Sequence, residues 1–188
     1  MYTASDLRKG LKVELDGEPW IITDFDFMKP GKGQAIYRCK LKNMITGITM
    51  ERSWRSNARF GRPNLSEREC VYSYYDGDAY VFSDNETFEE IRLSAETLGD
   101  QRHFLADNLE CTILYFNTTP LEVTLPFFVE QTVARTDPAV RGDTATSVTK
   151  PAYLENGYEL TVPPFINEGN TVKVDTRTGE YVERVSKA

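Results

Sequence analysis

The sequence has one histidine and three cysteines among 188 residues, so few side chains are suited to metal or nucleophilic chemistry. His103 lies in a polar stretch that favours a surface position, and no Ser-His-Asp or Cys-His set can be assembled without it. Cys39, Cys70 and Cys111 are far apart and lack CxxC spacing, so we expect reduced thiols rather than a disulfide framework or a zinc site. This inventory argues against an enzyme, and we expect no metal and no cofactor.

Long apolar runs are also missing. No segment approaches the length of a membrane span, and the N-terminus lacks the apolar core of a signal peptide. Together with the cysteine pattern, this predicts a cytoplasmic protein without a membrane partner. Gly31-Lys32-Gly33 is not a phosphate-binding P-loop either, because the upstream glycine and the following Ser or Thr are absent.

The composition favours β-strands. Ten Tyr, ten Phe and many β-branched residues suit strands, while nine Pro and twelve Gly supply turns. Residues 11–56 have the length and punctuation of a small SH3-like barrel, and Phe60-Gly61-Arg62-Pro63-Asn64 is typical of a linker. One or two short helices are expected near residues 94–105. Further strands are expected at residues 71–75, 79–83, 111–116, 121–125, 128–134, 170–175 and 180–185.

The most informative segment runs from Lys29 to Gln34. Strand-like sequence flanks it on both sides, Pro30 fixes φ, and Gly31 and Gly33 tolerate positive φ, so it predicts the tight tip of a β-hairpin. Lys32 would then stand alone at the end of a projecting arm. The alternative is an ordinary solvated lysine in a turn. The hairpin-tip set comprises Lys29, Pro30, Gly31, Lys32, Gly33 and Gln34.

Charge is distributed unevenly along the chain, although the net charge is −7. Residues 1–64 carry 12 basic and 7 acidic side chains, and residues 65–188 carry 10 basic and 22 acidic ones. A basic end suits phosphate, so we expect the first barrel to contact RNA; a merely solvated surface is the alternative. Because side chains alternate along strands, some of the candidate cations must face away from the RNA. These candidates are Arg38, Lys40, Lys42, Arg52 and Arg55, together with Lys29.

Three groups of motifs resemble the bacterial elongation factor P family over essentially the whole length. The N-terminal group is Leu11-Lys12-Val13-Glu14-Leu15-Asp16-Gly17-Glu18-Pro19-Trp20 and the segment Lys29 to Ala35. The middle group is Tyr75-Asp76-Gly77 and Asn85-Glu86-Thr87-Phe88-Glu89. The last group is Arg141-Gly142-Asp143-Thr144-Ala145, Lys150-Pro151-Ala152 and Val174-Asp175-Thr176-Arg177-Thr178-Gly179-Glu180-Tyr181.

The resemblance implies an all-β fold, with an SH3-like (KOW) barrel at residues 1–64 and two OB-fold barrels at residues 65–128 and 129–188. These would form an L-shaped monomer that mimics tRNA. It implies binding to both ribosomal subunits between the peptidyl-tRNA and exit sites, with peptidyl-tRNA and rRNA as partners, and relief of stalling at consecutive prolines. Lys32 falls on the position that many members modify, often with a β-lysyl group, so a lysine-modifying enzyme is a further expected partner.

The family pattern also places a loop of the last barrel beside the small subunit. This loop contains Arg141, Gly142, Asp143, Thr144 and Ala145, and we expect it to contact RNA; a simple surface connector is the alternative. Ala139 departs from the pattern, because a glycine commonly follows Asp-Pro there. Residues 55–62 are unusually basic, and they are either a solvated linker, which we favour, or an additional phosphate contact.

Positioning rather than acid–base chemistry is the expected mechanism. Proline is a poor partner in peptide-bond formation because its ring restricts the backbone and its nitrogen is hindered. Holding the peptidyl-tRNA end in attack geometry recovers rate without a catalytic group, and a solvated lysine, protonated at neutral pH, is a poor general base. The alternative function is a generic RNA-binding or RNA-chaperone protein, which predicts exposed stacking aromatics in the acidic barrels.

Overall fold

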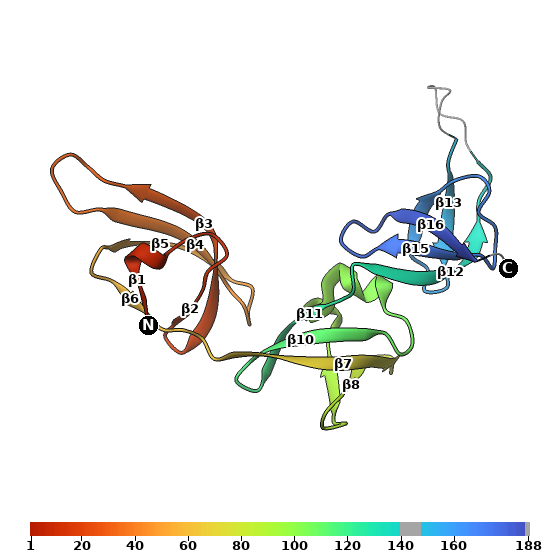
Figure 1. The fold of residues 1–188 in the computed structure, drawn as a ribbon, viewed down its shortest axis with the longest axis horizontal. Coiled ribbons are helices and arrows are strands. Elements are labelled where there is room, and N and C mark those ends of the chain that lie inside the picture. Colours follow the sequence, from red (N-terminus) through yellow and green to blue (C-terminus); the bar gives the residue numbers. More distant parts are fainter. Residues whose placement is uncertain (140–147, 187–188) are drawn as a thin grey trace. The chain divides into compact units, whose positions relative to one another are not determined.

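The computed structural model describes residues 1–139 and 148–186, and the fold is all-β, as predicted (Figure 1). In the described residues, all strands belong to one of four antiparallel sheets. One four-residue helix, α1 (Ala95–Leu98), and two 3-10 turns, η1 (Ala4–Asp6) and η2 (Gly99–Phe104), complete it. The α1–η2 pair confirms the helices expected near residues 94–105, and Ser94 caps α1 by accepting a hydrogen bond from the Thr97 N–H.

The sixteen strands of the described residues fall into three sequential groups. The first group is β1 (Tyr2–Thr3), β2 (Lys12–Leu15), β3 (Glu18–Met28), β4 (Ile36–Asn43), β5 (Thr49–Arg55) and β6 (Arg59–Phe60). The second is β7 (Leu65–Tyr75), β8 (Tyr80–Asp84), β9 (Glu90–Leu93), β10 (Glu110–Phe116) and β11 (Thr119–Thr124). The third is β12 (Phe128–Thr136), β13 (Lys150–Leu154), β14 (Glu159–Val162), β15 (Thr171–Asp175) and β16 (Tyr181–Ser186).

Each group forms a main sheet around its own apolar core. The first sheet has the order β2-β3-β4-β5, with β1 paired to β6 beside it. The middle sheet has the order β11-β10-β7-β8-β9, and the third has β14-β13-β12-β15-β16. Alternation along the strands directs one face inward, so that Val13 and Leu41 in the first sheet, Phe82 in the middle sheet and Val172 in the third are fully buried.

Contacts divide the chain into two compact units. The first unit comprises residues 1–67 together with 114–121, and the second comprises residues 68–113 and 122–188. The end of the β10–β11 hairpin joins the first unit because Leu114, Phe116 and Leu121 pack with Met44 and Leu65. The three-module division at residues 64 and 128 stays a prediction.

The expected linker at residues 60–64 is partly wrong. Phe60 is buried in the first core, pairs with Tyr2 and packs edge-on against Trp54 at 4.9 Å between ring centroids. Gly61 accepts a hydrogen bond from the Glu14 N–H at 2.9 Å. The short strand β6 was not predicted because Gly61, Arg62 and Pro63 follow Phe60 and are typical of a linker. The barrel therefore continues into residues that composition alone assigns to a linker.

The three cysteines are free and buried, in agreement with the expectation of reduced thiols. Burial raises the pKa of Cys39 and Cys70 to about 11 and that of Cys111 to about 12, so these thiols are unreactive at neutral pH. In the part of the chain that the structure describes, no helix is long and apolar enough to cross a membrane.

Candidate functional site

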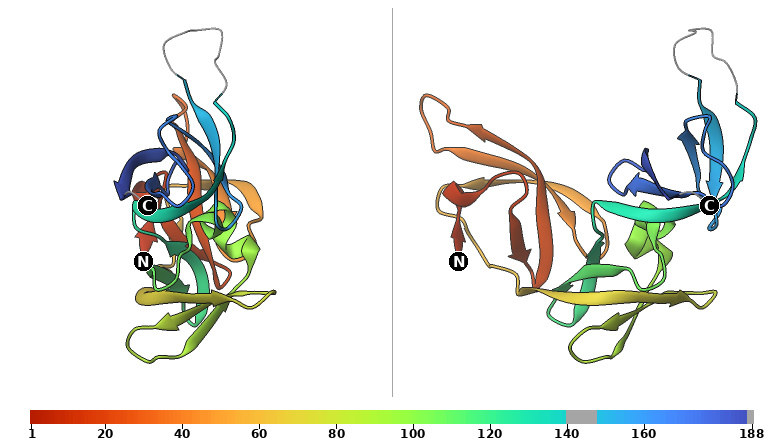
Figure 2. Two further views of the ribbon diagram at one scale, coloured as in Figure 1. Left: turned by 90° about the vertical axis from the view of Figure 1, so that its right-hand side faces the viewer. Right: turned by 45° about the vertical axis from the view of Figure 1, so that its right-hand side comes forward.

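The β3–β4 hairpin forms an arm whose loop extends beyond the strands of its sheet (Figure 1 and the right-hand view of Figure 2). Its ladder ends at the pair Met28 and Ile36, and residues 29–35 form the connecting loop. Lys32 lies at the midpoint of that loop, four residues from each end of the ladder. Every residue from Lys29 to Gln34 is exposed, so the hairpin-tip residues come together at one solvated end.

The tip is a hairpin, but it is wider than predicted. Seven residues connect the two strands, and neither Gly31 nor Gly33 has a positive φ. A Cβ atom at Gly31 would meet nothing within 4 Å, and one at Gly33 would meet only the Pro30 side chain at 3.6 Å. Neither backbone conformation nor packing against the described residues requires these glycines. Without a side chain at either position, the backbone here is open to close approach by a partner.

Aromatic side chains stiffen the arm below its tip. The Tyr37 ring lies 6.3 Å from Phe25 and 5.0 Å from Phe27, the latter in an edge-on arrangement. These three side chains share one face of the hairpin, because Phe25 and Phe27 pair with Cys39 and Tyr37. Such pairs add stability beyond simple burial. Because β5 also pairs with β4 as far as Ile36, the lysine is carried at the end of a braced, three-stranded part of the sheet.

The cationic candidates separate into two faces. Arg38, Lys40 and Lys42 alternate with the buried residues of β4 and therefore lie on its outer face, where Arg55 joins them opposite Ile36. Arg52 pairs with buried Cys39, so it lies on the opposite face although it is exposed. Arg52 is thus the candidate that turns away, as strand alternation required of some of them. We call Arg38, Lys40, Lys42 and Arg55 the outer basic face.

Acidic side chains on the neighbouring strands reduce the charge of this face, which the sequence analysis missed. In the β3–β4 ladder, Asp26 lies directly opposite Arg38, and Asp24 lies directly opposite Lys40. Glu51 lies across from Lys40, and its carboxylate is 3.7 Å from the Arg38 guanidinium. A signal was available, because folding the sequence about Lys32 already places Asp26 opposite Arg38.

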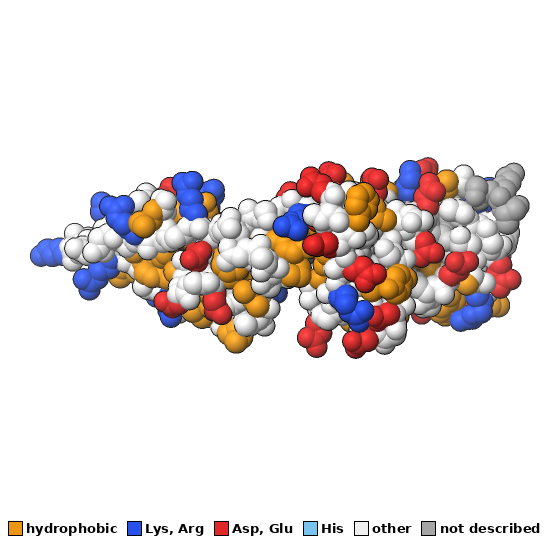
Figure 3. Space-filling view, turned by 90° about the horizontal axis from the view of Figure 1, so that it is seen from below, with side chains coloured by type: hydrophobic (Ala, Val, Ile, Leu, Met, Phe, Trp, Pro, Cys, Tyr) orange, Lys and Arg blue, Asp and Glu red, His pale blue; other side chains and the backbone are white. Residues whose placement is uncertain are grey.

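The second unit has the opposite character. In Figure 3, Lys and Arg side chains are the more numerous over the first sheet and its hairpin, and Asp and Glu side chains over the middle and third sheets. Exposed aromatics are present in this unit, including Tyr75, Phe88 and Phe127. Two of these three have partners in the chain: Tyr75 donates a hydrogen bond to the Gly77 carbonyl at 3.0 Å, and the Arg177 guanidinium lies 4.4 Å from the Phe127 ring centre.

The remaining candidates belong to the basic residues 55–62 and to the loop of the last barrel. Arg59 lies in β6 and Arg62 packs over the Tyr2 ring at 4.6 Å, so the basic residues 55–62 belong largely to the barrel rather than to a linker. The small-subunit-side candidates Arg141, Gly142, Asp143, Thr144 and Ala145 lie outside the described residues. Their role stays a prediction from the sequence.

Comparison with known families assigns all three groups of strands. The model of the elongation factor P KOW-like domain matches residues 3–60, and that of its OB domain matches residues 65–123. The elongation factor P C-terminal model matches residues 129–184. The chain belongs to the elongation factor P family.

Relatives in this family match over the full chain. Elongation factor P of Syntrophus aciditrophicus is 54% identical over 185 residues, covering 98% of this chain and 99% of that protein. The elongation factor P of Desulforapulum autotrophicum is 52% identical over 187 residues and covers both chains completely. Membership of the elongation factor P family makes this chain a translation elongation factor rather than an enzyme.

A solved structure shows the fold independently. Eukaryotic translation initiation factor 5A from Methanococcus jannaschii aligns with a TM-score of 0.53 at 21% identity, covering 66% of this chain and 92% of that chain. At this identity the likeness concerns the fold alone. It agrees with the barrel architecture that the elongation factor P models assign.

Proposed function

We propose that this factor acts on the ribosome between the peptidyl-tRNA and exit sites, where Lys32 positions the peptidyl-tRNA end for peptide-bond formation at consecutive prolines. The observation that carries the proposal is the arm itself. A lysine stands at the midpoint of a solvated loop on an aromatic-braced hairpin, and its flanking glycines serve no need of the fold. A cationic side chain held in this way can brace a tRNA terminus through phosphate and sugar contacts.

Rate enhancement would come from geometry. Orienting two reactants removes an entropic barrier that a misplaced, hindered proline otherwise raises, and no proton needs to move to or from the factor. The ribosome supplies the peptidyl-transferase centre, and the factor supplies alignment. We further propose that a lysine-modifying enzyme extends Lys32, because the exposed tip gives such an enzyme free access. The factor would work as a cytoplasmic monomer.

The outer basic face is proposed to contact rRNA or tRNA phosphates beside the tip. Arg38, Lys40, Lys42 and Arg55 share one face, whereas Arg52 does not. Because Asp24, Asp26 and Glu51 lie among these cations, the face offers a moderate rather than a strong positive field. Such a field suits a factor that must leave the ribosome after each event.

The RNA-chaperone alternative is less well supported. It requires stacking platforms within a positive groove, and the exposed aromatics, apart from Phe27 on the arm, lie in the unit that carries the acidic excess. Phe127, although exposed, is in contact with Arg177, whose charge is paired with Asp175. The acidic surroundings of most of these aromatics are the feature that disfavours single-stranded RNA.

A reconstituted translation assay tests the proposal. Lys32→Ala is expected to abolish rescue of a proline-run peptide while leaving synthesis of an ordinary peptide unchanged. Lys9→Ala, which removes an exposed lysine elsewhere in the same unit, is the matched control and is expected to behave as wild type. Normal proline-run synthesis with Lys32→Ala would refute the positioning role, and intact-mass analysis from the native host would show whether Lys32 carries an added group.

A further inference from the structure

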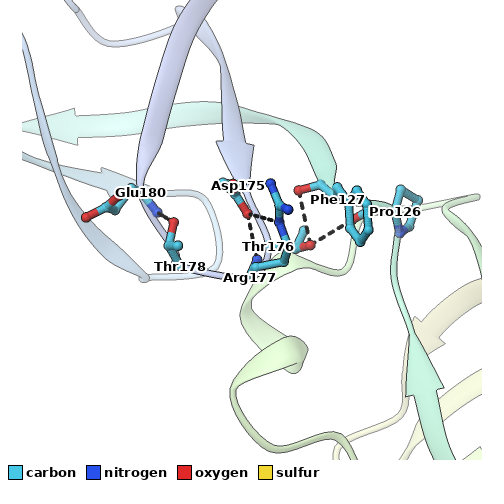
Figure 4. A network of polar contacts seen from close by, with 7 residues as sticks. All are labelled: Pro126, Phe127, Asp175, Thr176, Arg177, Thr178 and Glu180. Carbon is cyan, nitrogen blue, oxygen red and sulfur yellow. Dashed lines mark hydrogen bonds and ion pairs between the residues drawn. The ribbon is translucent and has the colours of Figure 1, made fainter.

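Residues 175–180, which join β15 to β16, form a turn of defined shape that we call the latch turn (Figure 4). The Asp175 N–H donates to the Glu180 carbonyl at 2.9 Å, and the Gly179 N–H donates to the Asp175 carbonyl at 2.7 Å. The Arg177 guanidinium binds both oxygens of the Asp175 carboxylate, at 3.1 and 2.9 Å. This pairing lowers the pKa of Asp175, so the ion pair is complete at neutral pH.

One side of the latch turn holds the connection between the middle and third sheets. Thr176 donates its hydroxyl to the Pro126 carbonyl at 2.7 Å and its N–H to the Phe127 carbonyl at 2.8 Å. The Arg177 guanidinium lies over the Phe127 ring at 4.4 Å. Pro126 and Phe127 are the residues between Leu125 and the start of β12, so these contacts fix the direction in which the chain leaves the middle sheet.

The other end of the latch turn meets the middle sheet's 3-10 turn through an aromatic contact. Tyr158 donates its hydroxyl to the Gly179 carbonyl at 3.3 Å, and its ring packs edge-on against Phe104 of η2 at 5.1 Å. A Cβ atom at Gly179 would lie 2.2 Å from the Tyr158 hydroxyl oxygen, and the φ of Gly179 is +77°. Only glycine satisfies both the conformation and the close approach.

Further contacts hold η2 against the third sheet. The His103 ring stacks on Tyr158 at 5.2 Å between centroids, with 26° between the planes. The Gln131 side chain of β12 donates to the Phe104 carbonyl at 3.3 Å, and the Asn156 side chain donates to the His103 carbonyl. The middle and third sheets are thus joined at two places, the Pro126–Phe127 connection and η2, and the latch turn touches both.

We propose that the latch turn fastens the middle and third sheets into one rigid body, with Thr176, Arg177 and Gly179 as its positioning residues. The two sheets already fall within one compact unit, apart from the first three residues of β7 and the β10–β11 hairpin end. This inference extends the proposed function, because a body that is ordered before binding avoids the entropic cost of ordering it on the ribosome. The latch would therefore set how tightly the factor binds, and Lys32 would set what it does once bound.

Rotational diffusion of the full chain tests the rigid body directly. In ¹⁵N relaxation, amides of the middle and third sheets are expected to share one correlation time in the wild type. Gly179→Ala is expected to split that value into two, because the added methyl group displaces Tyr158 from η2. Gly77→Ala is the matched control: Gly77 also has a positive φ, +96°, but its Cβ would meet nothing within 4 Å. It is expected to leave one shared value.

Thr176→Val is a second test of the latch that remains informative if Gly179→Ala fails to fold. It removes only the hydroxyl that reaches Pro126 and Phe127, while the size of the side chain is retained. Thr161→Val, at an exposed position of β14, is its control. A split correlation time with dispersed amide signals from both sheets supports the latch. A single shared value in both Gly179→Ala and Thr176→Val overturns it.

A titration of the factor in the proline-run assay separates the latch from the proposed function. Thr176→Val is expected to raise the half-saturating concentration about tenfold, in the usual range for coupling between parts of a protein, and to leave the rate at saturation intact. Lost rescue at saturation, or an unchanged half-saturating concentration, overturns the role of the latch in binding. If Lys32→Ala also rescues normally, the proposed function fails instead, while the relaxation result stands.

Discussion

Two glycine-containing turns of this chain contrast in what fixes their residues. In the latch turn, Gly179 has a positive φ and no room for a side chain, so the fold dictates it. At the hairpin tip, Gly31 and Gly33 have neither constraint. The comparison teaches that a residue which packing cannot explain points to an external partner, whereas a residue explained by packing need not touch one.

Exchanging glycine for alanine at both turns tests this contrast with the largest expected effect. Gly179→Ala is expected to reduce the free energy of unfolding by about 3 kcal/mol, because the left-handed conformation and the clash with Tyr158 both oppose the new methyl group. The double variant Gly31→Ala with Gly33→Ala is expected to change the free energy of unfolding by less than about 1 kcal/mol. A small increase would arise because alanine lowers the conformational entropy of the unfolded chain. Urea unfolding measures both, and equal losses in the two variants would erase the distinction.

A second variant tests whether Lys32 needs a stiff arm beneath the hairpin tip. Tyr37→Ala removes the ring that contacts both Phe25 and Phe27, and is expected to cost about 2 kcal/mol of unfolding free energy. The rescue rate is expected to fall as well, because Lys32 would then be carried on a fraying arm. Tyr37→Phe keeps the ring and is expected to retain both properties. Full rescue by Tyr37→Ala would show that a stiff arm is unnecessary.

The outer basic face gives a prediction for binding alone. Lys40→Glu with Lys42→Glu is expected to weaken ribosome binding and to lower the magnitude of its salt slope by about two. Arg52→Glu, on the opposite face of the same sheet, is expected to change the slope much less. Identical slopes for both variants would mean that the two faces are not distinguished by RNA.

The smallest expected effect concerns pH at η2. Burial lowers the pKa of His103 below its usual value of about 6.5, with neighbouring Arg102 acting in the same direction and Asp100 opposing it. The unfolded chain therefore takes up the proton more readily, so this contribution to stability is present above about pH 6.5 and is lost as the pH falls through that region. His103→Phe is expected to flatten the stability profile between pH 7.5 and 5.5. An unaltered profile would show that this imidazole is not involved.

Much of the fold could be predicted from local patterns. The strands on either side of Gly77, the helical turns after Ser94 and most other strands followed from turn residues and β-branched runs. The short strands β1 and β6 could not be predicted, because two-residue strands carry no periodicity and Phe60 sits beside Gly61 and Pro63. The union of the β10–β11 hairpin end with the first unit depends on long-range packing that no local pattern encodes.

The site was predicted in part for a similar reason. A single exposed lysine between glycines is a local signal, so Lys32 could be found from sequence. Which face of the sheet each basic side chain lies on depends on the register between β4 and β5. The sequence does not give that register, in which Arg52 lies opposite Cys39. The latch turn was visible as a motif, but its purpose required seeing Tyr158 against Gly179 and Thr176 against Pro126.

The division of labour between tip and latch is tested most directly by titrating Lys32→Met in single-turnover formation of a Pro–Pro bond. Methionine preserves the unbranched, flexible character of the side chain and removes its charge. We predict that the rate at saturating factor falls at least about tenfold, as expected when a reactant is misplaced, while the half-saturating concentration changes little. A saturating rate equal to that of the wild type would contradict the claim that Lys32 positions the reacting tRNA end.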